Sequence, residues 1–148
     1  MTAPHLTSFP LATWERDGLK AALARIGLPT EGIDDADRLF WRFETDELMP
    51  VGFGGLEIHG EHAILRSVVT LPPMRGKGIG AQMVAMLEVE ARGRGCRMLW
   101  LITARGVSYF GSFGYSPCDP AAVPAAISAT PQFTGAPPDA IAMSKILA

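Results

Sequence analysis

A glycine-rich turn between a β-rich run and an amphipathic helix is the feature that most constrains this chain. The segment 65–81 has the sequence LRSVVTLPPMRGKGIGA, with glycines at 76, 78 and 80. Glycine has no Cβ, so the turn can curl tightly and let a ligand approach its backbone N–H groups. The first N–H groups of the following helix have no partner within the helix and carry the positive end of its dipole. The segment therefore predicts a phosphate or pyrophosphate site, to which Arg75 and Lys77 add positive charge.

Two common nucleotide-binding motifs do not fit this turn. A P-loop requires GxxxxGK followed by Ser or Thr, whereas Lys77 is followed by Gly78. A dinucleotide-binding fold prefers GxGxxG, and the third glycine falls at 80 where 81 is needed. A strand-to-helix turn with ordinary capping glycines remains an open alternative on spacing alone.

The residues before the turn predict one helix followed by an antiparallel meander. Helical spacing of apolar residues predicts a helix over 11–26, which Gly27 ends. Strands with short turns between them are predicted over 38–43, 51–58 and 62–71. We assign no element to the first ten residues, and we expect 30–37 to be a solvated connector or a short irregular helix.

The residues after the turn alternate between helical and strand patterns. Ile79, Met83, Leu87 and Ala91 share one face of a helix. Further elements are predicted as a strand over 98–102, a helix over 107–113, a short helix near 121–129 and a closing strand near 140–147. The segment 119–139, with five prolines, is expected to be the least regular part of the chain.

Length, net charge and cysteine content exclude several classes of protein. The 148 residues suit one domain over 1–148, and a net charge of -2 argues against a general electrostatic hold on nucleic acid or an anionic membrane. Cys96 and Cys118 have no CxxC partner, and no metal site is expected. The longest apolar runs are too short to cross a bilayer and the start has no basic or apolar leader, so we expect a cytoplasmic protein. A homodimer is compatible with this composition.

Two segments together resemble a known family. The run 75–80, RGKGIG, resembles the (Arg/Gln)-x-x-Gly-x-(Gly/Ala) signature of the GNAT acyltransferase superfamily. The run 103–115, TARGVSYFGSFGY, is similar to the family's later segment, in which an aromatic pair precedes Gly-aromatic. The resemblance covers roughly residues 11 to 118. With the tail VPAAISATPQF, the chain looks most similar to the small acetyltransferases associated with arsenic resistance and to the N-acetylglutamate synthase branch.

The resemblance implies a fold, a cosubstrate and a reaction. The fold is an α/β (α+β) GNAT fold, with a mixed central sheet, an antiparallel N-terminal meander and a strand-helix-strand-helix half that binds acetyl-CoA. The reaction is direct attack of a neutral amine on the thioester, without a metal. The backbone N–H near Val69 would stabilise the developing negative charge. The residues implied to hold acetyl-CoA are Val68, Val69, Thr70, Arg75, Gly76, Lys77, Gly78, Ile79, Gly80, Ala81, Tyr109 and Phe110.

The sequence departs from the family pattern at the acid. Many members have a tyrosine where this chain has Phe110, and Tyr109 lies one helical step, about 100°, away. The thiolate of coenzyme A could leave unassisted, since a free thiol has a pKa near 8.5. We interpret Phe110 as a packing residue against the coenzyme A arm.

The base and the acceptor residues are predicted from position on the strands. The candidates for the base are Glu44, Glu57, His59, Glu61 and His62, and we choose Glu57 because it lies on the strand that many members turn toward the acceptor. Arg66 could clamp a carboxylate or other oxyanion of the acceptor. The residues predicted to bind the acceptor are Arg66, Ser67, Thr103 and Phe43.

Three functions are compared on this basis. The leading hypothesis is an N-acetyltransferase for a small-molecule amine, an amino acid or an arsenical amino-acid analogue. A GNAT-like sensor or interaction module that binds coenzyme A without catalysis is the alternative, motivated by the missing tyrosine. Acetylation of peptides is a third hypothesis, for which the acidic cluster within 31–37 is the only marked attraction to a basic tail.

Overall fold

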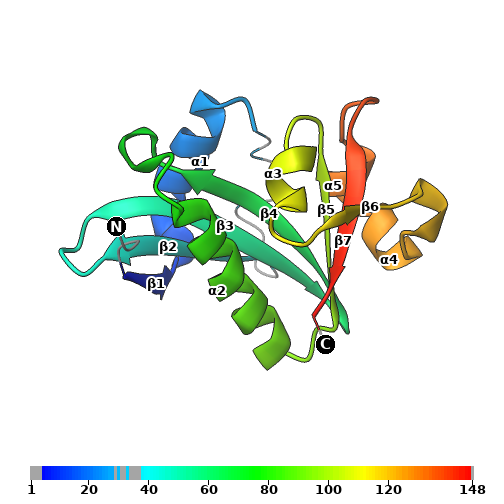
Figure 1. Ribbon diagram of the computed structural model, residues 1–148, viewed down its shortest axis with the longest axis horizontal. Helices are drawn as coiled ribbons and strands as arrows, with labels where there is room; N and C mark the ends of the chain where they lie inside the picture. The colour runs from blue at the N-terminus through cyan, green and yellow to red at the C-terminus, as the bar shows by residue number, and fades with distance from the viewer. Residues whose placement is uncertain (1–4, 29, 31–32, 34–37, 148) are drawn as a thin grey trace.

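The computed structural model describes residues 5–28, 30, 33 and 38–147, and its centre is one mixed sheet of seven strands (Figure 1). The sheet order is β1-β2-β3-β4-β5-β7-β6. Only the pair β4–β5 is parallel among the paired strands of the described residues. The strands are β1 (Leu6–Pro10), β2 (Arg38–Thr45), β3 (Pro50–His59), β4 (His62–Thr70), β5 (Met98–Thr103), β6 (Ser116–Pro117) and β7 (Ile141–Ile146).

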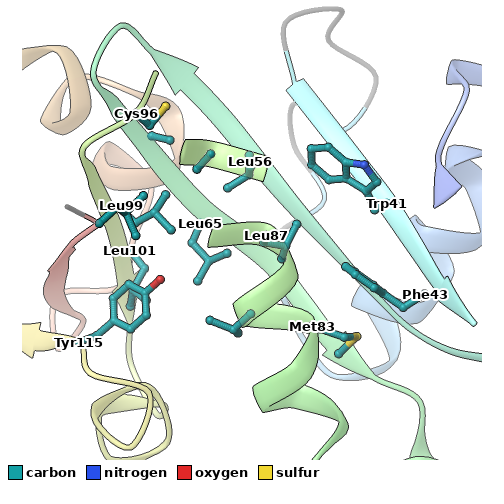
Figure 2. Close-up of a cluster of buried hydrophobic side chains, with 14 of the residues drawn as sticks. Trp41, Phe43, Leu56, Leu65, Met83, Leu87, Cys96, Leu99, Leu101 and Tyr115 are labelled. Carbon is teal, nitrogen blue, oxygen red and sulfur yellow. The ribbon is translucent and has the colours of Figure 1, made fainter. Parts of the chain in front are cut away.

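The two longer helices cover opposite faces of the sheet (Figure 1). Alternation along β2 sends Trp41 and Phe43 into the cluster under α2, whereas Phe40 packs with Leu19 and Leu23 of α1. Figure 2 shows Met83 and Leu87 of α2 among the side chains of this first cluster. The α-helices are α1 (Arg16–Arg25), α2 (Ile79–Gly93), α3 (Val107–Gly111), α4 (Ala125–Ser128) and α5 (Pro131–Thr134), and three 3-10 turns span Thr13–Glu15, Pro72–Met74 and Pro120–Ala122.

The predicted helices and strands occur in the predicted order, but several bounds differ and the short strand β6 was not predicted. The first ten residues contribute the edge strand β1, and the helix predicted over 11–26 is shorter because a 3-10 turn precedes it. The helix predicted over 121–129 is interrupted, since one 3-10 turn ends at Ala122 and α4 begins only after its N-cap, Pro124. Helix α5, with proline at its first position, was not predicted. Except for residues 30 and 33, the predicted connector lies outside the described residues.

Strands β4 and β5 pair at one end only, and this creates an opening in the sheet. Their register pairs His62 to Ile64 with Met98 to Trp100, and beyond it the strands diverge toward α3 (Figure 1). A bulge lies at the point of divergence, because Ser67 and Val68 on β4 face the single residue Gly54 on β3. Ser67 has a positive φ of 58°. Bulges increase local twist, so this one turns the second half of β4 away from β5.

No α-helix in the part of the chain that the structure describes is both long and apolar enough to span a membrane.

Candidate active site

A cleft of about 480 Å³ lies where β4 separates from β5. One wall is the end of β4, the floor is the glycine-rich turn with the first residues of α2, and the other wall is α3. The described lining contains one charged side chain, Arg75. Its residues are Ile26, Val68, Val69, Thr70, Met74, Arg75, Gly76, Gly78, Ile79, Gly80, Ala81, Tyr109, Ser112 and Phe113.

The glycine-rich turn presents backbone rather than side chains to this cleft. Gly76 and Gly78 have φ of 79° and 75°, a left-handed conformation that favours glycine. Gly78 is the N-cap of α2, a helix of 15 residues, so its first N–H groups and dipole lie at the cleft floor. Arg75 is held beside them because its Nε donates to the carbonyl of Thr70 at 3.1 Å. This geometry suits a pyrophosphate.

The cleft brings together all of the predicted cofactor residues except Lys77 and Phe110. Lys77 is exposed and does not line the cleft. Gly76 and Gly78, on either side of it, are the residues of the turn whose backbones face the cleft. Phe110 lines a neighbouring cavity instead. Four further lining residues were not predicted, because they are apolar or small and their spacing forms no motif: Ile26, Met74, Ser112 and Phe113.

Tyr109 reaches across the cleft from α3. Its ring packs edge-on against Phe113, with ring centroids 4.7 Å apart. Its hydroxyl lies over Gly80 and interacts with the side chain of Thr70. Burial raises the pKa of Tyr109, and the contact with Thr70 opposes this only in part. The phenol therefore stays protonated at neutral pH and can donate a hydrogen bond within the cleft.

The backbone pairing of β4 with β3 shows where the N–H of Val69 points. The N–H of Leu71 donates to the carbonyl of Val51 at 2.8 Å, so this residue points its backbone at β3. Backbone direction alternates along a strand, so Val69, opposite Phe53, also points at β3. The carbonyl of Val69 accordingly lies against Gly52. The N–H of Val69, predicted as the donor, therefore faces β3 rather than the opening, and the adjacent Val68 lines both the cleft and the neighbouring cavity.

The neighbouring cavity, of about 100 Å³, contains the predicted acceptor residues Arg66, Ser67 and Thr103. Arg66 is only 5% exposed; its Nε donates to the Ser67 hydroxyl at 3.1 Å and its guanidinium lies over the ring of Phe40. Its described lining is Leu28, Leu65, Arg66, Ser67, Val68, Leu101, Ile102, Thr103, Phe110 and Gln132. We name it the acceptor cavity. Gln132, which lies on α5, was not predicted.

The structure contradicts two predicted site residues, Phe43 and Glu57. Phe43 is fully buried under α2, because alternation along β2 turns it away from the opening. Glu57 is 1% exposed, and Arg38 holds it with an Nη2 to Oε1 distance of 2.7 Å. Neither residue lines the cleft or the acceptor cavity. Glu57 is corrected from a catalytic base to a buried ion-pair partner.

The other candidate bases also lie outside both cavities. Glu44 accepts a short contact from Arg42, and His62 Nδ1 accepts a hydrogen bond from the Trp100 indole at 3.0 Å. His59 and Glu61 are likewise not lining residues. Among the described residues of the two linings there is therefore no carboxylate and no imidazole. The described residues also hold no cluster of three or more His, Cys, Asp or Glu side chains that could bind a metal.

Comparison with known proteins identifies the family. The model of the Acetyltransferase (GNAT) family matches residues 4–115, so the chain belongs to the GNAT acetyltransferases. The arrangement of strands confirms the predicted GNAT fold. A search of curated proteins gives no match by sequence.

Solved structures of very different sequence share the fold. N-acetylglutamate synthase from Neisseria gonorrhoeae, solved with coenzyme A and N-acetyl-glutamate, has a TM-score of 0.82 at 14% identity. The match covers 99% of this chain and 36% of that one, so this chain spans about a third of that enzyme. Rv2747 from Mycobacterium tuberculosis, solved with coenzyme A, has a TM-score of 0.73 at 18% identity. The match covers 96% of this chain and 99% of that one.

A third structural neighbour is named for a different kind of acceptor. The ribosomal-protein-S18-alanine N-acetyltransferase from Escherichia coli gives a TM-score of 0.72 at 18% identity, covering 97% of this chain and 95% of that one. Neighbours named for glutamate and for a protein alanine share one fold. The fold therefore does not identify the acceptor, which must be argued from the site.

Proposed function

We propose that this protein transfers acetyl from acetyl-CoA to the amine of a small molecule that also carries an anionic group, an amino acid or an arsenical amino-acid analogue. The single observation that carries the proposal is the junction at Val68, where a cleft with a pyrophosphate-binding floor meets a small cavity that contains a buried arginine. The thioester and the amine would meet at this junction.

The cofactor half of the proposal rests on the turn and the first residues of α2. The N–H groups there would bind the pyrophosphate of coenzyme A, and Arg75 would add charge. The pantetheine arm would run along the open edge of β4, past Thr70 and Val68. The N–H of Val68 would then donate to the thioester carbonyl and stabilise the negative charge that develops on it.

The acceptor half rests on Arg66. A guanidinium binds carboxylate and related oxyanions with two parallel hydrogen bonds, and burial strengthens this attraction. The acceptor cavity measures about 100 Å³ against about 480 Å³ for the cleft, which favours a small acceptor over a polypeptide. The distinction between an ordinary amino acid and an arsenical analogue depends on which acceptor gives the higher kcat/KM.

The proton transfers would use little help from side chains. Since the described linings hold no carboxylate or imidazole, the amine would enter already neutral or lose its proton to water. Phe110 has no proton to give, so the thiolate would leave directly or take a proton from solvent. Tyr109 lies on the cofactor side, where we assign it to the pantetheine arm.

Activity of the purified protein tests the proposal. Acetyl-CoA is supplied with a panel of amino acids, including phosphinic and arsinic analogues, and release of the coenzyme A thiol is measured. Thiol release that depends on an anionic acceptor, and that Arg66→Met reduces at least about tenfold, is the expected result. Calorimetry that detects no acetyl-CoA binding at micromolar concentrations would overturn the proposal. Tight binding without thiol release for any amine would favour a sensor instead.

A further inference from the structure

The polar groups of the acceptor cavity comprise one cation and three neutral side chains among the described lining residues. Among its described lining residues, Arg66 is the only charged side chain. The remaining polar side chains, Ser67, Thr103 and Gln132, are neutral. The Ser67 hydroxyl already accepts from Arg66, and the Thr103 hydroxyl accepts from the backbone N–H of Gly106 at 2.8 Å. Each hydroxyl keeps its own O–H donor, whereas Gln132 is the neutral polar side chain of this described lining with no hydrogen bond to another described residue.

The side-chain amide of Gln132 makes no hydrogen bond to any residue that the structure describes. An amide offers two donors and one acceptor. Gln132 is half-buried and lines the cavity, so a ligand bound there lies beside this side chain. An acceptor side chain that carries an oxygen would satisfy the amide and gain a hydrogen bond.

Helix α5 holds Gln132 firmly in this position. Phe133, the next residue, packs on Trp100, Ile127 and their neighbours. Thr130, the N-cap of α5, is buried and its hydroxyl donates to the carbonyl of Ile127 at 2.6 Å. One step along a helix rotates a side chain by about 100°, so anchoring Phe133 in the apolar cluster directs Gln132 elsewhere. The amide is therefore positioned by packing rather than by a mobile loop.

We propose that Gln132 determines specificity for the acceptor side chain. This inference rests on the proposed function: Arg66 binds the acceptor's carboxylate or equivalent oxyanion, and the Gln132 amide donates to an oxygen on its side chain. The preferred acceptors are therefore amino acids whose side chain ends in a carboxylate, an amide or another oxyanion. Cationic side chains are disfavoured, because the Gln132 amide would turn its N–H donors toward an oxygen and would gain nothing from a cation.

Two substitutions of Gln132 test the assignment by changing selectivity. Gln132→Glu replaces a donor with a negative charge, so kcat/KM for glutamate should fall about 100-fold. The value for alanine, whose side chain does not reach the amide, should change less than about threefold. Gln132→Ala should lower kcat/KM for both glutamate and glutamine about tenfold, again with little change for alanine. The exposed neighbour Thr134→Ala is the matched control and should change neither.

The outcomes separate this inference from the proposed function. Equal losses for glutamate and alanine, or no change in either variant, would overturn the role of Gln132 while leaving the acetyltransferase intact. If the wild-type protein binds acetyl-CoA but acetylates no amino acid, the proposed acceptor class fails and the inference fails with it. Calorimetric titration of glutamate into the complex with coenzyme A gives a second readout, in which Gln132→Glu should weaken binding. Circular dichroism checks that each variant is folded.

Discussion

The phenol oxygen of Tyr109 lies directly over the Cα of Gly80, so close that a Cβ at position 80 would overlap it. The third glycine of the turn therefore has a different reason from the first two. Gly76 and Gly78 are needed for their positive φ, whereas Gly80 leaves room for a side chain from α3. This contact joins the two walls of the cofactor cleft at the N-terminus of α2.

Gly80→Ala should therefore weaken cofactor binding without unfolding the protein. The new methyl would displace the Tyr109 hydroxyl from Thr70 and into the cleft, while alanine suits the helix better than glycine. We expect the Kd for acetyl-CoA to rise about tenfold, measured by calorimetry, with an unchanged or higher Tm. In Gly80→Ala/Tyr109→Ala the clash is absent, so Gly80→Ala should add no further loss on the Tyr109→Ala background. An unchanged Kd in the single variant would contradict this account.

Ser67→Gly should separate the effect of backbone strain at the bulge from the effect of the Ser67 hydroxyl. A serine at φ 58° is held in a region that costs about 1 kcal/mol or more, and glycine adopts it freely. The free energy of unfolding, from urea titration, should therefore not fall. The hydroxyl that accepts from Arg66 is lost, so the KM for the acceptor should rise about fivefold while the Kd for acetyl-CoA stays the same.

Ser67→Val is the contrasting variant. A β-branched residue is poorly tolerated at positive φ, and we expect a loss of about 2 kcal/mol in unfolding free energy. Equal stability of the valine and glycine variants would show that the bulge conformation is not fixed as described.

The site was predictable from sequence where local backbone chemistry determines it. The conformation of the glycine-rich turn is set by its own residues and by the helix that follows. Gly76 and Gly78 have the left-handed conformation expected of them. Residues brought by tertiary packing were not predictable in this way. The tail that carries Gln132 is divided into short helices by prolines and has no period to follow, so its approach to β4 has no signal in the chain.

The errors at Glu57 and Val69 have one cause, which is strand register. Whether a strand residue points to one face or the other, and whether its N–H points at one neighbour or the other, changes with every residue. A bulge shifts this alternation by one, and the bulge at Ser67 and Val68 lies between the two parts of β4. A serine at positive φ is uncommon, and no residue in the segment 65–69 (LRSVV) predicts one.

The absence of a carboxylate or imidazole from the described linings of the two cavities predicts the pH dependence of the reaction. If the neutral amine attacks without a protein base, kcat/KM should rise tenfold per pH unit up to the pKa of the acceptor's own amine. A steady-state profile over pH 6 to 10, with two acceptors of different amine pKa, should show the bend move with the acceptor. A plateau that begins near pH 6.5 with both acceptors would instead indicate a histidine base.

A second polar network, away from the cavities, joins α2 to the C-terminal strands. The Tyr115 hydroxyl donates to Glu88 Oε2 at 2.9 Å, and Lys145 Nζ lies 3.1 and 3.0 Å from the two oxygens of the same carboxylate. Lys145 also donates to the carbonyl of Phe113 at 2.9 Å. Glu88 is 5% exposed and Tyr115 2%. The network thus fixes the end of the α3 segment against α2 and β7.

Lys145→Met should destabilise the fold by about 3 kcal/mol, because it leaves the buried Glu88 charge without its partner. Tyr115→Phe should cost about 1 to 2 kcal/mol. Burial, followed by the neighbouring Glu88, raises the pKa of Tyr115 above its ordinary value near 10. A raised pKa in the folded state means that this contribution is complete below pH 10 and is lost as the pH rises further. Urea unfolding between pH 8 and 11.5 should therefore show wild-type stability falling more steeply above pH 10 than that of Tyr115→Phe, and parallel curves would show that Tyr115 does not titrate as a buried group.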